Sequence, residues 1–224
     1  MSVYMTEEEQ LQAIKKWWKR YQNAITIVLV IVLLMVSAYK YWNWHQEKIT
    51  QQASNAYEHL MVAFSNQDNK GVRAYASQLL NDYSDTVYAD AAHLTLAKLY
   101  VVRENYPKAQ KELESVALHS KAPTLQQIAK IRLVRLFVAI KSYDKALSEL
   151  ETVEDKAYLP VVNELKGDIY AATGQYQEAV LFYRKAITEV QTHGMGNPFL
   201  EMKTNELFAQ TQSMKVVDRK VQTV

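Results

Sequence analysis

The side chains best suited to metal binding or acid–base catalysis are few and scattered in this sequence. Its five histidines are His45, His59, His93, His119 and His193. A zinc site built on a helix typically uses two histidines four residues apart, or cysteines that complete a mixed set. No two of these histidines have that spacing, and the chain contains no cysteine. The sequence therefore predicts no metal site, and we interpret His93, near the face of a predicted helix, as a structural or solvated residue.

Other kinds of active site leave no signature either. A phosphate-binding loop needs clustered glycines after a strand, and many serine hydrolases carry the motif G-x-S-x-G. Neither pattern occurs, and the absence of cysteine excludes a thiol nucleophile and a disulfide framework. We therefore expect no catalytic residues, no cofactor and no small-molecule substrate: this chain is not predicted to be an enzyme.

The composition favours helices and gives no reason to expect nucleic acid. Only 5 glycines and 4 prolines occur in 224 residues, whereas sheets need many turn-forming residues. The first 44 residues hold five basic and three acidic side chains, which leaves 21 of each sign for the rest of the chain. A neutral domain without a basic stripe lacks the electrostatic footprint of a nucleic-acid-binding protein.

Residues 24–39, AITIVLVIVLLMVSAY, form an uncharged apolar segment. As a helix this segment would span about 24 Å, and aromatic rings stand on both sides of it, as they do at membrane–water interfaces. These rings belong to Trp17, Trp18, Tyr21, Tyr39, Tyr41, Trp42 and Trp44. We therefore expect a transmembrane helix over residues 23–44 rather than the buried core helix of a soluble domain.

Basic side chains are more frequent before this segment than after it. Lys15, Lys16, Lys19 and Arg20 precede it, and Lys40 and Lys48 follow it. The positive-inside rule then predicts a single-pass protein of the bacterial inner membrane, with a cytoplasmic N-terminus and a periplasmic C-terminal domain. A cleaved signal peptide is the alternative, with a loose cleavage pattern at residues 36–38. We favour an uncleaved anchor, because the polar region before the segment is long and the aromatic belt continues beyond residue 38.

The chain after Trp44 repeats itself. Apolar residues recur three and four positions apart, which indicates helices in series. Between residues 159 and 191 the spacing G-x2-Y-x8-A-x3-Y-x2-A matches the tetratricopeptide repeat (TPR) pattern. Gly167 and Ala179 fall where the two helices of a hairpin approach closely, and Gly174 falls at the turn, where a positive φ is needed.

Two upstream windows follow the same scheme. Ala109, Ala146 and Ala179 are 37 and 33 residues apart, which brackets the TPR period of about 34 residues. The joints at 105–109, 142–146 and 175–179 read NYPKA, SYDKA and QYQEA. The middle repeat departs from the pattern at Val134 and Leu150, so a wholly regular superhelix is not expected. The predicted fold is all-α: a single N-terminal transmembrane helix followed by a TPR-like α-solenoid of helical hairpins.

Atypical segments flank the repeats. Residues 5–20 predict an amphipathic helix that begins at Thr6, and residues 45–65 and 71–83 predict a helix pair that is either a degenerate repeat or a cap. Residues 198–212 predict a closing helix after a turn at 194–197. The expected organisation is a cytoplasmic segment (1–22), a transmembrane helix with aromatic flanks (23–44), a periplasmic TPR-like domain (45–212) and a polar, frayed C-terminal tail (213–224).

Along nearly its whole length the sequence resembles the ancillary subunit of the bacterial SecYEG translocon, the YfgM family. The most specific stretches are Tyr4 with Glu7, Glu8 and Glu9; Tyr41-Trp42-Asn43 with His45-Gln46; Tyr88-Ala89-Asp90-Ala91-Ala92; and Leu200-Glu201-Met202-Lys203. The resemblance implies a single-span inner-membrane protein that associates with the translocon and with a membrane-anchored periplasmic chaperone of the PpiD type, assisting exported polypeptides. It implies no catalytic residues.

TPR domains usually bind partners on the concave wall formed by the first helix of each hairpin. In register with Gly167, the wall positions are Leu94, Lys98, Val101, Ile131, Arg135, Val138, Glu164 and Asp168. This apolar strip with two cations and two anions suits an extended, partly hydrophobic polypeptide or a partner helix. The other interpretation is that a terminal helix of the chain itself fills the strip.

Two non-enzymatic functions follow. The first is a tethered protein–protein interaction module that links the translocon to periplasmic chaperones and assists exported proteins. The second is a structural scaffold for the assembly of another cell-envelope complex.

Overall fold

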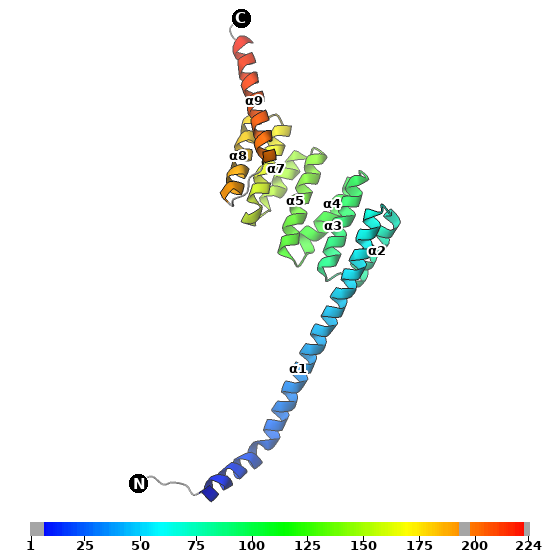
Figure 1. The fold of residues 1–224 in the computed structure, drawn as a ribbon, viewed down its shortest axis with the longest axis vertical. Helices are drawn as coiled ribbons and strands as arrows, with labels where there is room; N and C mark the ends of the chain where they lie inside the picture. Colours follow the sequence, from blue (N-terminus) through cyan, green and yellow to red (C-terminus); the bar gives the residue numbers. More distant parts are fainter. Residues whose placement is uncertain (1–6, 193–197, 222–224) are drawn as a thin grey trace, which may run out of the picture. The chain divides into compact units, whose positions relative to one another are not determined.

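The computed structural model describes residues 7–192 and 198–221, and in these residues it contains helices and no strand. The helices are α1 (Glu7–Ser65), α2 (Asn69–Asp82), α3 (Val87–Val102), α4 (Tyr106–His119), α5 (Pro123–Ala139), α6 (Tyr143–Glu151), the 3₁₀ turn η1 (Lys156–Tyr158), α7 (Leu159–Ala172), α8 (Tyr176–Thr192) and α9 (Pro198–Val221). The chain divides into two units between Gln52 and Ala53. The predicted all-α class is confirmed (Figure 1).

The first unit consists, in its described part, of α1 up to Gln52. We expected separate helices over 5–20, 23–44 and 45–65, but α1 runs unbroken from Glu7 to Ser65. No glycine or proline occurs between these two residues, so nothing interrupts the helix. The N-cap expected at Thr6 lies outside the described residues.

The apolar segment of α1 presents its side chains outward. Every side chain of residues 24–39 is exposed, and α1 is the one described helix long and apolar enough to cross a bilayer. Lipid is the solvent that accepts such a surface. The hydroxyl of Thr26 donates to the carbonyl of Gln22 at 2.7 Å, so this polar group is satisfied within the helix. At the two ends, the rings of Trp17 and Tyr21 lie 5.5 Å apart and those of Tyr41 and Trp44 lie 6.1 Å apart.

The second unit is a series of helical hairpins with one repeated joint. Gln67, Glu104, Lys141 and Gly174 have φ angles of 58°, 57°, 59° and 78°. The N–H of the next residue donates to the carbonyl five positions earlier in each joint: Asp68 to Ala63, Asn105 to Tyr100, Ser142 to Phe137 and Gln175 to Tyr170, all at 2.8–2.9 Å. This geometry is the Schellman motif that ends a helix. The positive φ expected at Gly174 is confirmed, and the same joint connects the end of α1 to α2.

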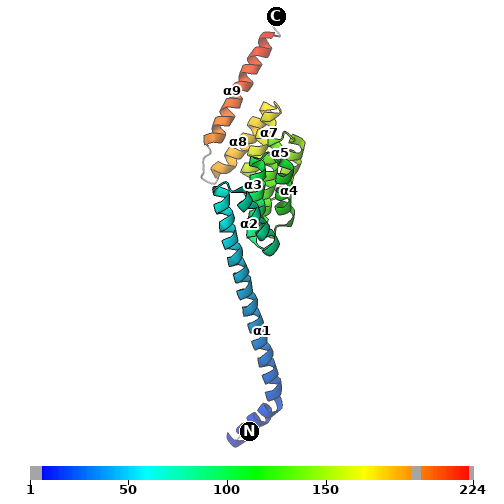
Figure 2. The same cartoon turned by 90° about the vertical axis from the view of Figure 1, so that its right-hand side faces the viewer.

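The positions predicted to be small lie where helices meet. Ala109, Ala146 and Ala179 are fully buried. A β-carbon added to Gly167 would lie 2.5 Å from the ring of Tyr183, so the predicted close approach of α7 and α8 is confirmed. In Figures 1 and 2, α3, α4, α5, α7 and α8 follow one another through this unit.

The middle hairpin is irregular, as its sequence predicts. Its second helix, α6, has only 9 residues and is followed by the 3₁₀ turn η1. Val134 and Leu150, which replace the usual small or aromatic residues, are buried in the main core cluster. The larger side chains therefore fill space that a regular hairpin would close by bringing its helices together.

The C-terminal helix is longer than expected. We predicted a closing helix over 198–212 and a frayed tail from 213, but α9 continues to Val221. No glycine or proline follows Pro198, so the chain has no residue that would end the helix earlier. Leu200 of α9 is fully buried and belongs to a cluster with Ala179, Tyr183 and Ala186 of α8.

Candidate partner-binding groove

A groove of about 380 Å³ lies between α3 and α5. Its lining residues are Leu94, Ala97, Lys98, Val101, Leu113, Arg132, Arg135, Leu136 and Ala139. On α3, positions 94, 98 and 101 are spaced by four and three residues, so these side chains share one face of the helix. On α5, positions 132, 135 and 139 share a face for the same reason. Two neighbouring first helices of hairpins therefore form the walls, as expected for a TPR-like domain.

Four of the eight predicted wall residues line this groove: Leu94, Lys98, Val101 and Arg135. Ile131 instead lies in the core, with 5% of its surface exposed, and Val138 packs against the same core. The three predicted residues of α3 thus line the groove, whereas on α5 Arg132 lines it in place of Ile131. That these residues bind a partner stays a prediction.

Arg132 is the one charged residue lining the groove that the sequence did not predict. It is exposed, it lies one turn before Arg135, and it lines the groove where Ile131 was expected. The charge of Arg132 could have predicted its position. Ile131 and Leu133 on either side of it are apolar, and a charged side chain between them must point away from the core, because burial of an unpaired charge is costly.

A second, smaller pocket of about 210 Å³ extends the groove toward the first hairpin. It shares Leu94, Lys98 and Arg132 with the first and adds side chains from the last turns of α1 and from α3: Tyr57, Met61, Phe64, Ala91 and Thr95. The ammonium of Lys98 lies 5.1 Å from the centre of the Phe64 ring, a cation–π distance. These shared residues make the two pockets neighbouring parts of one surface, which we call the α3–α5 groove.

The two predicted anions, Glu164 and Asp168 of α7, lie in a different environment. Lys203 of α9 places its ammonium 2.8 Å from Asp168 Oδ1 and 3.7 Å from Glu164 Oε1. The hydroxyl of Tyr183 donates to Asp168 Oδ1 at 2.6 Å. Burial, together with the neighbouring Asp168 and Glu164, raises the pKa of Tyr183, because its ionised form would be both desolvated and repelled. At α7, therefore, Lys203 of α9 already pairs with the two acidic residues of the predicted wall.

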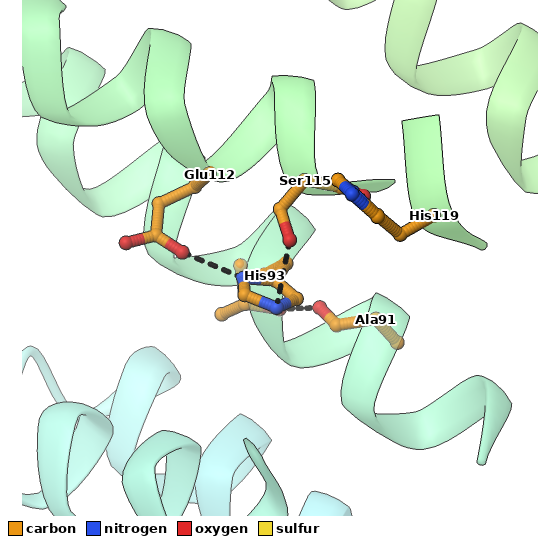
Figure 3. Close-up of polar contacts among 6 residues, drawn as sticks. Ala91, His93, Glu112, Ser115 and His119 are labelled. Carbon is orange, nitrogen blue, oxygen red and sulfur yellow. Dashed lines mark hydrogen bonds and ion pairs between the residues drawn. The ribbon is translucent and has the colours of Figure 1, made fainter. Parts of the chain in front are cut away.

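His93 lies in a polar cluster that no sequence motif indicated (Figure 3). It projects from α3 toward α4, with Nδ1 at 2.6 Å from Glu112 Oε2 and Nε2 at 3.3 Å from the hydroxyl of Ser115. A serine hydroxyl hydrogen-bonded to a histidine that is itself hydrogen-bonded to a glutamate also occurs in the catalytic triads of hydrolases. Ser115, however, lies inside α4, where backbone N–H groups are used by the helix, so no donors are directed at a reacting oxyanion. The arrangement joins α3 to α4, in agreement with the structural role predicted for His93.

Comparisons with known proteins agree with the fold. Residues 15–209 match the family described as "Tetratricopeptide repeat-like domain". A protein of Aggregatibacter actinomycetemcomitans named "Ancillary SecYEG translocon subunit" is 30% identical over 186 residues, covering 83% of this chain and 91% of the relative. Proteins of the same name from Neisseria gonorrhoeae and Escherichia coli are 26% and 25% identical; each alignment covers 92% of this chain, and 100% and 99% of the relative.

Proposed function

Since the chain belongs to the tetratricopeptide repeat-like family of ancillary SecYEG translocon subunits, we propose that it is a non-enzymatic, membrane-anchored protein–protein interaction module that associates with the SecYEG translocon. In this proposal it links the translocon to a membrane-anchored periplasmic chaperone of the PpiD type and assists exported polypeptides. The α3–α5 groove is the observation that carries the proposal.

The groove supports binding of a polypeptide rather than chemistry. Its lining combines six apolar residues with three cations, and it contains no pair of groups poised for proton transfer or nucleophilic attack. It is open along the first helices of neighbouring hairpins, the surface on which a repeat protein receives an extended segment or a helix.

The exposed apolar segment of α1 supports the membrane anchor, and the flanking cations support an inward N-terminus. Because the chain has no cysteine, single cysteines report topology cleanly. In cells with a permeabilised outer membrane, we expect a membrane-impermeant maleimide to label Ser77→Cys in α2. Gln12→Cys in α1 should react only after the inner membrane is lysed. The reverse labelling, or loss of an N-terminal tag from the mature protein, would contradict the proposed anchor.

Partner association is tested by purification from membranes. A tag after Val224, used under mild detergent conditions, should recover the translocon subunits and the periplasmic chaperone together with the chain. Recovery of neither would refute the proposal.

A photoreactive residue distinguishes direct binding in the groove from mere proximity. Val101 is 39% exposed and lines the groove, whereas Leu118 of α4 is 71% exposed and lies outside it. We expect crosslinks from position 101 to the translocon, the chaperone or exported chains, and few from position 118. Crosslinks from position 101 to another envelope complex alone would instead support the scaffold function.

A further inference from the structure

We propose that the α3–α5 groove receives an acidic polypeptide segment, one that presents carboxylates beside apolar side chains; this inference rests on the proposed function as a binding module. This inference restricts the expected partner from any partly hydrophobic polypeptide to one that is also negatively charged.

The charge of the groove is of one sign. Lys98, Arg132 and Arg135 line it, and neither pocket includes an aspartate or glutamate. The part of the chain outside the first 44 residues holds equal numbers of acidic and basic residues, so this is a local separation of charge rather than a property of the whole. Such a surface attracts segments of opposite charge.

The three cations have no ionic partner among the residues that the structure describes. The ion pairs found there join His93 to Glu112, Lys121 to Asp85, and Lys203 to Glu164 and Asp168. The two acidic residues expected to balance the predicted wall are therefore paired with α9, which leaves Lys98, Arg132 and Arg135 available. All three side chains are exposed in the free protein.

The floor of the groove is apolar. Leu94, Ala97, Leu113 and Leu136 are buried beneath it, with Val101 and Ala139 at its open edge. Apolar side chains of a partner would contact this floor and remove it from water. The same partner would cover the cations and strip their hydration, which costs free energy unless carboxylates replace the lost water. A neutral or basic apolar segment could cover the floor but could not pair with the cations. The groove therefore favours a segment that has both apolar side chains and carboxylates.

An anionic membrane surface offers the same charge, but the shape of the site favours a polypeptide. The floor lies between helix walls, and individual side chains can enter such a groove, whereas a bilayer presents a broad surface. Arginine also forms paired hydrogen bonds with a carboxylate, which suits a few positioned partners.

The test uses the full chain in phosphatidylcholine nanodiscs and two fluorescent peptides of about 18 residues with leucines at helical spacing. One peptide carries glutamates beside the leucines, and the other carries glutamines at the same positions. Fluorescence anisotropy gives both dissociation constants. We expect the wild-type chain to bind the glutamate peptide about tenfold more tightly than the glutamine peptide.

Matched variants locate the effect. Arg132→Gln with Arg135→Gln should abolish the preference for the glutamate peptide. Lys111→Gln with Lys145→Gln removes the same charge from exposed positions on α4 and α6, outside the groove, and should preserve the preference. Equal binding of the two peptides by wild type, or equal losses in both double variants, would refute the proposal. It would also be wrong if wild type failed to discriminate the peptides while added phosphatidylglycerol vesicles bound wild type better than the arginine variant.

The inference and the proposed function fail separately. If the wild-type chain recovers translocon subunits from membranes but does not discriminate the peptides, the acidic-partner inference is wrong and the proposed function stands. If it discriminates the peptides through Arg132 and Arg135 but recovers no translocon subunit, the proposed function is wrong and the acidic specificity of the groove stands.

Discussion

The ring of Tyr183 occupies the space into which a side chain at Gly167 would project, so that an added β-carbon would lie 2.5 Å from two ring carbons. Tyr183 is 2% exposed, and its hydroxyl is held by Asp168, so the ring cannot easily move aside. The contact sets the separation of α7 and α8, and it explains why a residue with poor helix propensity stands in the middle of α7.

Gly167→Ala should therefore destabilise the second unit. Overpacking costs about 1–3 kcal/mol, which exceeds the roughly 0.5–1 kcal/mol that alanine gains over glycine in a helix. Thermal unfolding of the full chain in detergent, followed by far-ultraviolet circular dichroism, measures the change. In a Tyr183→Leu background the added cost of Gly167→Ala should shrink. An identical cost in both backgrounds would show that the ring is not the obstacle.

Tyr183 also predicts a specific dependence of stability on pH. Its pKa is raised in the folded protein, so the folded state holds the phenolic proton more firmly than the unfolded state. The resulting stabilisation is fully present below the unfolded pKa of about 10 and is lost as pH rises from there toward the folded pKa. Tyr183→Phe has no such proton. Above about pH 10, the wild-type stability should therefore fall more steeply than that of the variant, and parallel curves would contradict the assignment.

Much of the fold follows from periodicity, and the deviations have identifiable causes. Three hairpins were predicted because alanines and joints recur in phase. The helix pair at 45–65 and 71–83 was also predicted, but not that its joint at Gln67–Asp68 repeats the other three, because Val72 stands where the other hairpins have alanine. A Schellman geometry depends on backbone hydrogen bonds, which glutamine, glutamate or lysine can make at a cost in strain.

The groove was harder to predict than the fold. The α3 residues predicted from spacing do line the groove, but spacing also placed Ile131 on the wall of α5, where Arg132 lies instead. A single helix face follows from a period of about 3.6 residues, but packing against both neighbours decides which of two adjacent positions is buried. The pairing of Lys203 with Asp168 joins residues 35 positions apart, and spacing gives no information about contacts between helices at that separation.

Replacing lysine by glycine should have opposite effects on stability at Lys141, in a joint between helices, and at Lys145, inside the next helix. Lys141 has a φ of 59°, which glycine adopts without strain, so Lys141→Gly should raise the free energy of unfolding by about 0.5–1 kcal/mol. Lys145 lies inside α6, so Lys145→Gly should lower it by about 1 kcal/mol. Thermal unfolding of the two variants beside wild type measures both changes, and destabilisation by both would show that the joint tolerates lysine without strain.

Gln127 predicts a stabilising substitution. Its side chain is 8% exposed, and its carbonyl oxygen Oε1 has no hydrogen-bond partner among the described residues. A buried polar atom without a partner costs about 1–3 kcal/mol. Gln127→Met keeps a similar length without that atom and should raise the free energy of unfolding by about 1 kcal/mol. Gln126→Met is the control. The side-chain amide of Gln126 donates a hydrogen bond to the carbonyl of Ser120 at 2.7 Å, so removing it should lower the free energy of unfolding. A loss of stability in Gln127→Met would show that its carbonyl is satisfied in solution.

Lys203 predicts how firmly α9 is held. Its ammonium lies 2.8 Å from Asp168, with both side chains about one quarter exposed, and Glu164 lies 3.7 Å away. Lys203→Met leaves the carboxylates of Asp168 and Glu164, each about one quarter exposed, without this cation, which should weaken docking of α9 by about 1 kcal/mol after allowance for solvent screening. Hydrogen exchange measured by mass spectrometry should then show faster exchange in residues 198–209, with α3 and α5 unchanged. Lys185→Met, which removes an exposed cation from α8, is the matched control and should leave exchange in α9 unaltered. If Lys203→Met also left it unaltered, the buried side chain of Leu200, rather than the ion pair, would hold the helix in place.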